Sequence, residues 1–248
     1  MFASFAHATG FCGSVWSPVI DELDNVDCVS WDFAGHGSGP SLKTPIEWKT
    51  FGEQVLDETR PGGIGVGHSM GAAALLMAQL ADPRRFAFLV LIEPIVFPGP
   101  HARIEEHPLA YASLRRRRTF ESREAARANF ASKPAFANWS TDVMDGYVSC
   151  GLLGDGPVEL ACDPEIEAEI YIASNAHDTF ERLGEIEIPV LLLAGEDSDT
   201  TPPEVTRMQA AQFERAGVEI VSGAGHFLPM ENPGLVSERV QRLAEILG

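Results

Sequence analysis

Short runs of hydrophobic residues alternate with stretches of helical periodicity in the first and last parts of this chain. Alternation of this kind predicts parallel strands joined by helices. We expect helices near residues 17–23, 44–58, 70–81, 203–216 and 233–247. We expect strands at residues 2–6, 27–31, 64–67, 86–92, 189–194 and 218–221.

The alternation stops between about Pro94 and Gly184, where the pattern is helical and no strong strand is visible. The clearest helices cover residues 119–131, 141–152 and 164–174. An insertion between two strands of a parallel sheet is expected to lie over the carboxyl edge of the sheet, where ligands bind in open α/β folds. The sequence therefore predicts an α/β core with a mostly parallel sheet flanked by helices (1–94 and 185–248) and a helical cap (95–184).

Composition favours one core that needs no metal or disulfide. The chain has 248 residues, of which 45% are hydrophobic, and α/β folds of this length commonly form one unit. The four cysteines are widely spaced and contain no C-x-x-C pair. We expect free buried thiols rather than a disulfide framework or a zinc site at these positions, which are Cys12, Cys28, Cys150 and Cys162.

The formal net charge of −18 argues against nucleic acid or anionic lipid as a partner, because both are polyanions. No apolar run approaches the ~18 residues that span a bilayer. The apolar residues that follow Met1 have no basic residue before them, unlike a signal peptide. We therefore expect a cytoplasmic protein with no membrane partner. The one basic cluster, Arg115 to Arg118, is interpreted as a solvated helix face rather than a site for an acidic ligand.

A five-residue pattern, Gly67-His68-Ser69-Met70-Gly71, stands between an expected strand and an expected helix. This context is typical of a nucleophile elbow, in which the serine occupies a strained turn. Side chains at Gly67 and Gly71 would collide with the neighbouring strand and helix. The helix that begins at Met70 points its free N–H groups at the position of a developing oxyanion. The pattern therefore predicts that Ser69 is a nucleophile.

A serine nucleophile needs a general base and a group that orients this base. Among the seven histidines, only His226 follows the last expected strand, in a loop of small residues. The acid is expected in the loop after the strand that ends at residue 194, which contains Glu196, Asp197 and Asp199. Because the loop is expected to continue for a few residues past the strand before it turns, Asp199 is favoured as the acid. Asp197 is the alternative acid, and Glu196 ranks third.

The oxyanion hole needs two backbone N–H donors. Met70 is expected to supply one of them. The loop after the first strand is expected to supply the other, with Thr9 favoured and Ala8 or Phe11 as alternatives. His7, at the start of this loop, is expected to brace the loop rather than take part in catalysis.

Taken together, these segments resemble the capped α/β-hydrolase superfamily of esterases, lipases and carbon–carbon bond hydrolases. Residues 7–10 resemble its His-Gly oxyanion loop, residues 32–39 its D-x-x-G-H-G-x-S loop, residues 67–71 its elbow and residues 225–227 its catalytic histidine loop. The resemblance covers the chain except for the cap. It implies an α/β-hydrolase fold with a serine, an acid and a histidine as its triad.

The chain departs from this pattern in two places. Many relatives carry one or two further strands before the oxyanion loop, so either the sheet is shortened or the sequence lacks its natural start. Ala8 replaces the usual glycine, which allows more backbone angles than alanine does. Relatives that dehalogenate or open epoxides use aspartate at the elbow, and Ser69 argues against both activities.

We expect a serine hydrolase that cleaves a small-molecule carboxylic ester through an acyl-enzyme, with no cofactor and no metal. A carbon–carbon bond hydrolase or a lyase would use the same triad. A protein of another class, a ligand receptor or signalling protein on a hydrolase scaffold, is the third hypothesis. The cap aromatics Phe97, Trp139 and Tyr147 are candidates for the pocket wall, although core packing is favoured for each. For Glu93, at the end of a strand, a structural hydrogen-bonding role is favoured over catalysis.

Overall fold

A six-stranded parallel sheet forms the centre of the protein, and the computed structural model describes all of residues 1–248. The strand order is β2-β1-β3-β4-β8-β9, and every neighbouring pair is parallel. The expected mostly parallel sheet is therefore confirmed, and each strand lies close to its expected position. The strands are β1 (Phe2–Ala6), β2 (Asp27–Ser30), β3 (Gly63–His68), β4 (Phe86–Ile92), β8 (Val190–Gly195) and β9 (Ala216–Val221).

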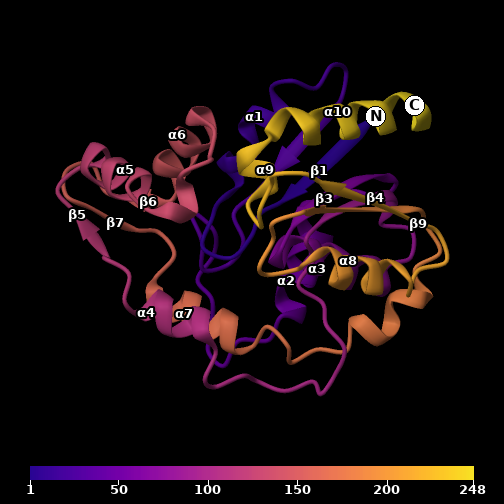
Figure 1. The fold of residues 1–248 in the computed structure, drawn as a ribbon, viewed down its shortest axis with the longest axis horizontal. Coiled ribbons are helices and arrows are strands. Elements are labelled where there is room, and N and C mark those ends of the chain that lie inside the picture. The colour runs from indigo at the N-terminus through magenta and orange to yellow at the C-terminus, as the bar shows by residue number, and fades with distance from the viewer.

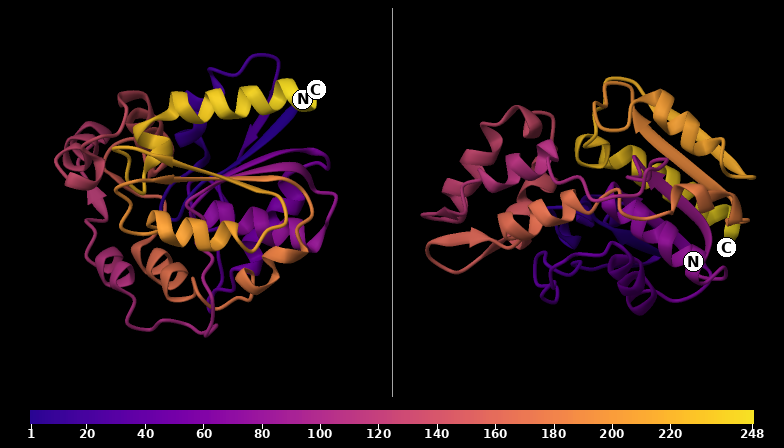
Figure 2. Two further views of the ribbon diagram at one scale, coloured as in Figure 1. Left: turned by 45° about the vertical axis from the view of Figure 1, so that its right-hand side comes forward. Right: turned by 90° about the horizontal axis from the view of Figure 1, so that it is seen from below.

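Helices cover both faces of this sheet (Figures 1 and 2). Successive side chains of a strand point to opposite faces, so Leu89 and Leu91 belong to one buried cluster and Val90 and Ile92 to the other. The first face is covered by α2 (Lys49–Glu58), α3 (Met70–Ala81) and α8 (Pro203–Ala210). The second face is covered by η1 (Gly13–Trp16), α1 (Ser17–Ile20) and α10 (Pro233–Leu247), with α9 (Leu228–Glu231) before α10.

The segment between β4 and β8 forms a separate group of elements. Apart from residues 180–185, which pack against α3 of the core, Figure 1 shows it on the side of the sheet opposite the N-terminus, beyond the carboxyl ends of the parallel strands. Side chains of Ser122, Ser140 and Asp163 accept hydrogen bonds from the first turns of three of its helices, which fixes where those helices begin. The helical elements are α4 (Pro108–Leu114), α5 (Arg123–Ala131), η2 (Pro134–Phe136), α6 (Thr141–Cys150), α7 (Pro164–Ile172) and η3 (Phe180–Glu185).

The expectation that this segment contains only helices is wrong. It also holds a small antiparallel sheet of order β5-β7-β6. Strands of two or three residues are too short for an alternating pattern to appear in the sequence, which explains why they were not expected. The three strands are β5 (Thr119–Phe120), β6 (Leu152–Leu153) and β7 (Val158–Leu160).

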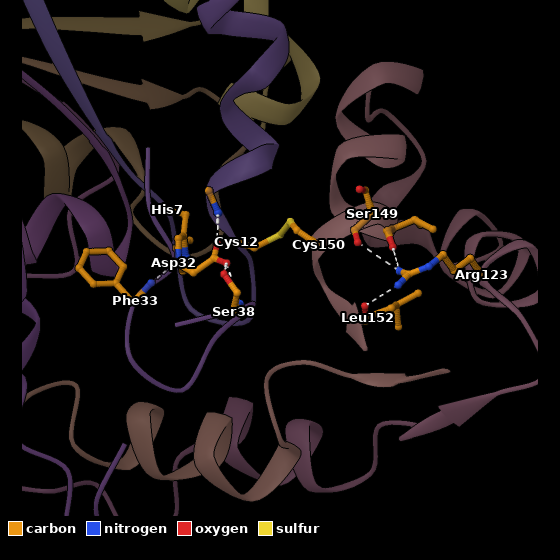
Figure 3. Close-up of a disulfide and its surroundings, with 12 residues drawn as sticks. His7, Cys12, Asp32, Phe33, Ser38, Arg123, Ser149, Cys150 and Leu152 are labelled. Carbon is orange, nitrogen blue, oxygen red and sulfur yellow. Dashed lines mark hydrogen bonds between the residues drawn. A yellow bond between two sulfur atoms is a disulfide. The ribbon is translucent and has the colours of Figure 1, made fainter. Parts of the chain in front are cut away.

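The expectation of four free thiols is also wrong. Cys12 and Cys150 form a disulfide with their Cα atoms 6.2 Å apart, while Cys28 and Cys162 are free. Cys12 lies in the loop after β1 and Cys150 ends α6, so the bond ties a loop of the core to the inserted segment (Figure 3). The two cysteines are 138 positions apart in the sequence, and no local pattern predicts this pairing. No helix of the protein has both the length and the apolar character needed to cross a membrane.

Candidate active site

Ser69 occupies a strained turn between β3 and α3. Its φ of 56° and ψ of −116° lie outside the regions that side chains favour. The Ser69 N–H donates to the carbonyl of Ile92 at 2.9 Å. A Cβ on Gly71 would lie 2.2 Å from the carbonyl oxygen of Ala6, and one on Gly67 would lie 2.7 Å from the backbone of Ala72. The two glycines therefore let strand and helix close tightly around the serine.

The close contact of Gly71 with the end of β1 brings the next loop beside the first turn of α3. The first N–H groups of a helix have no partner within that helix, and the N–H of Met70 is one of them. The Thr9 N–H makes no hydrogen bond with the rest of the protein, and Thr9 is only 7% exposed. Two N–H groups near the elbow are thus free to receive a ligand oxygen. Their role as an oxyanion hole stays a prediction.

His7 connects this loop to the loop after β2. Its Nδ1–H donates to the carbonyl of Ala8 at 2.7 Å, and its Nε2 accepts from the N–H of Phe33 at 3.0 Å. The side chain is fully buried, which lowers its pKa to about 4 and keeps it neutral. Asp32 adds a second link, because its Oδ1 accepts from the Gly13 N–H at 2.7 Å (Figure 3). These contacts fit the bracing role expected for His7.

His226 follows β9 and lies against the residue before Ser69. The rings of His68 and His226 are 4.9 Å apart, and His68 Nε2–H donates to the carbonyl of His226 at 2.8 Å. Burial, together with the nearby His226, holds the pKa of His68 well below its usual range, so His68 stays neutral. The Nδ1 of His226 forms a hydrogen bond with the Oε2 of Glu93. His226 therefore lies beside the turn that holds Ser69, and that the two act together stays a prediction.

Glu93 is the partner of His226, and the protein surrounds its carboxylate completely. It follows the last residue of β4, has a φ of 48° and is 0% exposed. Besides the bond from His226, its Oε1 accepts from the Gly195 N–H at 2.8 Å. Its Oε2 accepts from the hydroxyls of Ser198 at 2.6 Å and Thr201 at 2.7 Å. Four donors thus satisfy a buried carboxylate and fix its orientation toward the imidazole.

The expectation that Asp199 or Asp197 accepts the Nδ1 hydrogen of His226 is wrong in this structure. Both aspartates and Glu196 are exposed. The Oδ1 of Asp199 accepts only from the neighbouring Thr200 hydroxyl, at 3.2 Å. The acidic loop turns these side chains toward solvent, where they act as solvated charges.

The strand order explains why the end of β4 supplies the carboxylate. β4 lies between β8 and β3, the strand that ends just before Ser69, so Glu93 emerges beside the elbow. The loop after β8 contributes hydroxyl donors to Glu93, from Ser198 and Thr201, instead of an acid. The sequence signal for Glu93 was a single acidic residue directly after a buried strand, at a position where only a structural role was expected.

An aromatic group lies beside the His226 loop. The rings of Phe11, Trp139 and Phe227 have centroids 5.3 to 5.7 Å apart in each pair. Phe11 comes from the loop after β1, Trp139 from the inserted segment, and Phe227 follows His226. Trp139 and Tyr147 are buried, and Phe97 is partly exposed. Apolar side chains from core and insertion thus meet next to the site.

The site brings together the groups that acyl transfer requires. These are a serine on a strained turn, an imidazole oriented by a buried carboxylate, and free N–H groups at a helix start. No group of three or more His, Cys, Asp or Glu side chains is arranged to hold a metal ion.

Comparison with known proteins gives three kinds of similarity. Residues 5–239 match the sequence model of the alpha/beta hydrolase family. The abhydrolase domain-containing protein AKT2 of Alternaria alternata is 26% identical over 207 residues, covering 68% of this chain and 78% of that protein. The peroxisomal alpha-beta-hydrolase Lpx1 of Saccharomyces cerevisiae has a similar structure, with a TM-score of 0.87, 20% identity, and coverage of 99% of this chain and 76% of that one.

The esterase Rv0045c of Mycobacterium tuberculosis is also similar in structure. Its TM-score is 0.76 at 18% identity, and the match covers 99% of this chain and 84% of that one. At such low identity the two solved structures show a shared fold. The match to the family's sequence model covers nearly the whole chain, insertion included.

Proposed function

This chain belongs to the alpha/beta hydrolase family, and on that premise we propose that it is a serine hydrolase that cleaves carboxylic esters. The substrate would be a small or medium-sized hydrophobic ester, and the reaction would pass through an acyl-enzyme on Ser69. The observation that carries the proposal is the buried hydrogen bond between Glu93 and His226, next to the strained serine turn.

The first half of the reaction would form the acyl-enzyme. His226 takes the proton of the Ser69 hydroxyl through Nε2, because Nδ1 is engaged by Glu93. The serine oxygen attacks the acyl carbon, and the N–H groups of Met70 and Thr9 hold the oxyanion. When the intermediate collapses, His226 returns the proton to the leaving alcohol. Water, deprotonated by the same histidine, then releases the acid and restores Ser69.

Glu93 would orient the imidazole and stabilise its positive charge when it takes the proton of Ser69. Its side chain is 0% exposed and that of His226 is 15% exposed, so water screens the pair weakly. The donors from Gly195, Ser198 and Thr201 hold the carboxylate in position before the reaction starts. Such preorganisation is what an acid in a serine triad requires.

The inserted segment, residues 95–184, would act as a cap. Phe11, Trp139 and Phe227 bring apolar surface from the core and the insertion to the same place beside His226. Such surface favours a hydrophobic acyl or alcohol group and excludes bulk water from the reacting atoms. This is the basis for proposing a hydrophobic ester.

The test is hydrolysis of short p-nitrophenyl esters by the purified protein and by Ser69→Ala. We expect turnover by the wild type and a loss of at least a thousandfold in kcat for the variant, with an unchanged circular dichroism spectrum. Absence of turnover of every acyl ester, together with absence of labelling by a fluorophosphonate, would refute the proposal.

The same assay separates the other substrates and roles. A dienedione in the panel reports carbon–carbon bond cleavage, and faster turnover of it than of any ester would move the assignment to that reaction. A slow single turnover that leaves a stable adduct on Ser69 would indicate a receptor rather than an enzyme.

A further inference from the structure

One ion pair of the inserted segment lies directly against the loop that carries Thr9. Arg116, which follows α4, pairs through a guanidinium nitrogen with the Oε2 of Glu167 on α7. A second guanidinium nitrogen donates to the hydroxyl of Tyr147 on α6 at 2.9 Å. The side chains of Arg116 and Glu167 are 24% and 7% exposed. Water therefore screens this pair far less than a surface pair.

The contact with the loop is made at Gly10, the residue after Thr9. A Cβ on Gly10 would lie 2.7 Å from Oε1 of Glu167 and 3.4 Å from a guanidinium nitrogen of Arg116. The φ of Gly10 is 79°, in the region that favours glycine. Both charges of the ion pair thus face the backbone of this loop, which would hold one oxyanion donor.

Arg116 differs from the rest of the basic cluster in which it stands. Arg115, Arg117 and Arg118 are exposed, as expected, but the expectation of a helix face is wrong, because the cluster follows the end of α4 in a turn and loop. Burial by itself would lower the pKa of Arg116, but the Tyr147 hydroxyl and the Glu167 carboxylate raise it above the ordinary value of arginine. The guanidinium is therefore permanently charged, and one arginine of the cluster has a partner at the site.

The charges next to Gly10 affect a reaction in which negative charge develops on a substrate oxygen held by the adjacent N–H groups. An unpaired Glu167 carboxylate would oppose an oxyanion held by the Thr9 N–H. As a general scale, two like unit charges about 8 Å apart at an effective dielectric constant of about 20 repel each other by an amount that corresponds to roughly a 30-fold change in rate. The guanidinium of Arg116 cancels this effect as long as the pair is intact.

We propose that Arg116 is a positioning residue for acyl transfer, which compensates the charge of Glu167 beside the oxyanion loop and so protects the transition state. This inference rests on the proposed function, because it assumes that an oxyanion forms at Thr9 and Met70. Neither residue of the pair touches the reacting atoms. Their effect is exerted through the field at the loop and through the contact with Gly10.

The test measures kcat and KM for p-nitrophenyl butyrate with Arg116→Gln, Glu167→Gln and the double variant. Arg116→Gln leaves an uncompensated carboxylate, so kcat is expected to fall at least tenfold while KM changes less than threefold. Glu167→Gln leaves a positive charge near the oxyanion, so kcat is expected to stay at or above the wild-type value. The double variant removes both charges, and its kcat is expected to return to within threefold of the wild type.

A purely structural ion pair predicts a different pattern. Both single variants would then lower kcat alike in proportion to their loss of melting temperature, and the double variant would not recover; this result would overturn the proposal. Arg103→Gln is the matched control, because Arg103 pairs at 2.7 Å with Glu169, which lies on α7 as Glu167 does. Neither residue of this control pair is among the nearest neighbours of Gly10. The kcat of Arg103→Gln is expected to stay within twofold of the wild type.

Two further arms keep the outcome decisive. If Arg116→Gln does not fold, Arg116→Lys retains the charge and is expected to keep kcat within threefold of the wild type. A tenfold loss in folded Arg116→Lys or folded Glu167→Gln would overturn the inference. Ser69→Ala is assayed in parallel. A wild type that hydrolyses no ester, or an unaffected Ser69→Ala, refutes the proposed function itself, whereas a working Ser69 with the structural pattern refutes only the role of Arg116.

Discussion

Replacement of Glu93 by glutamine tests which carboxylate orients His226. The substitution keeps the size of the side chain and removes its charge. The donors from Gly195, Ser198 and Thr201 remain in place. The amide oxygen can satisfy only part of this donor set, and the amide N–H₂ group offers no acceptor to the Nδ1–H of His226.

The size of the effect follows from the burial of the pair. Glu93 is 0% exposed and the side chain of His226 is 15% exposed. The imidazolium that forms in the transition state gains about 4 kcal/mol from a unit charge at about 4 Å with an effective dielectric constant of about 20. Loss of that interaction corresponds to roughly a thousandfold fall in kcat. We therefore expect kcat of Glu93→Gln to be lower by about three orders of magnitude.

Steady-state hydrolysis of p-nitrophenyl butyrate gives kcat and KM for this comparison. Asp199→Asn is the matched control, because it removes one carboxylate charge from the acidic loop after β8. Asp199 is exposed and its carboxylate bonds only to the neighbouring Thr200, so kcat is expected to stay within twofold of the wild type. The reverse order, a hundredfold loss in Asp199→Asn with less than a tenfold loss in folded Glu93→Gln, would show that Asp199 and not Glu93 orients His226.

Three further predictions concern stability. Burial lowers the pKa of His7 from 6.5 to about 4, so between these pH values the unfolded chain binds a proton that the folded chain does not. The free energy of unfolding should therefore fall by about 1.4 kcal/mol per pH unit for this histidine as pH drops from 6.5 to 4. Urea titrations over this pH range measure the effect, and a flat profile would contradict the prediction. Replacing both Cys12 and Cys150 by serine should lower the free energy of unfolding by about 2–4 kcal/mol in the same assay. Gly71→Ala places a Cβ 2.2 Å from a backbone oxygen, so it should lower the free energy of unfolding by about 1–3 kcal/mol and remove most of the activity. The control Gly156→Ala has no atom within 4 Å of its Cβ and should change neither stability nor activity.

The sheet could be predicted from the sequence because each strand is a short apolar run of its own. The run at β4 (Phe86–Ile92) and the Ala-rich helix α3 (Met70–Ala81) match their expected bounds. The position of Ser69 followed from the order strand, turn, helix, which is local information. In the inserted segment the signal was weaker, because strands such as β5 (Thr119–Phe120) contain too few residues to show a period.

The partner of His226 could not be predicted in the same way. Choosing between Glu93 and Asp199 requires the order of strands across the sheet, where β4 lies between β3 and β8. The sequence gives the order along the chain only. The three acidic residues after β8 made that loop the apparent source of the acid, whereas the loop supplies hydroxyl donors through Ser198 and Thr201.

The disulfide and the contact of Arg116 with Gly10 depend on long-range folding too. The bond joins Cys12 to Cys150 across 138 residues, and the ion pair of Arg116 and Glu167 meets Gly10 from another part of the chain. Each contact joins the loop after β1 to the inserted segment. Such contacts follow from how the insertion packs on the core, which no local pattern encodes.

Covalent labelling shows directly whether Ser69 is the nucleophile. The purified protein is incubated with a fluorophosphonate, digested, and analysed by mass spectrometry. We expect a single adduct on Ser69, within the peptide that contains residues 67–71, and no adduct in Ser69→Ala. Absence of labelling in the folded wild type, or equal labelling of Ser69→Ala, would contradict this expectation.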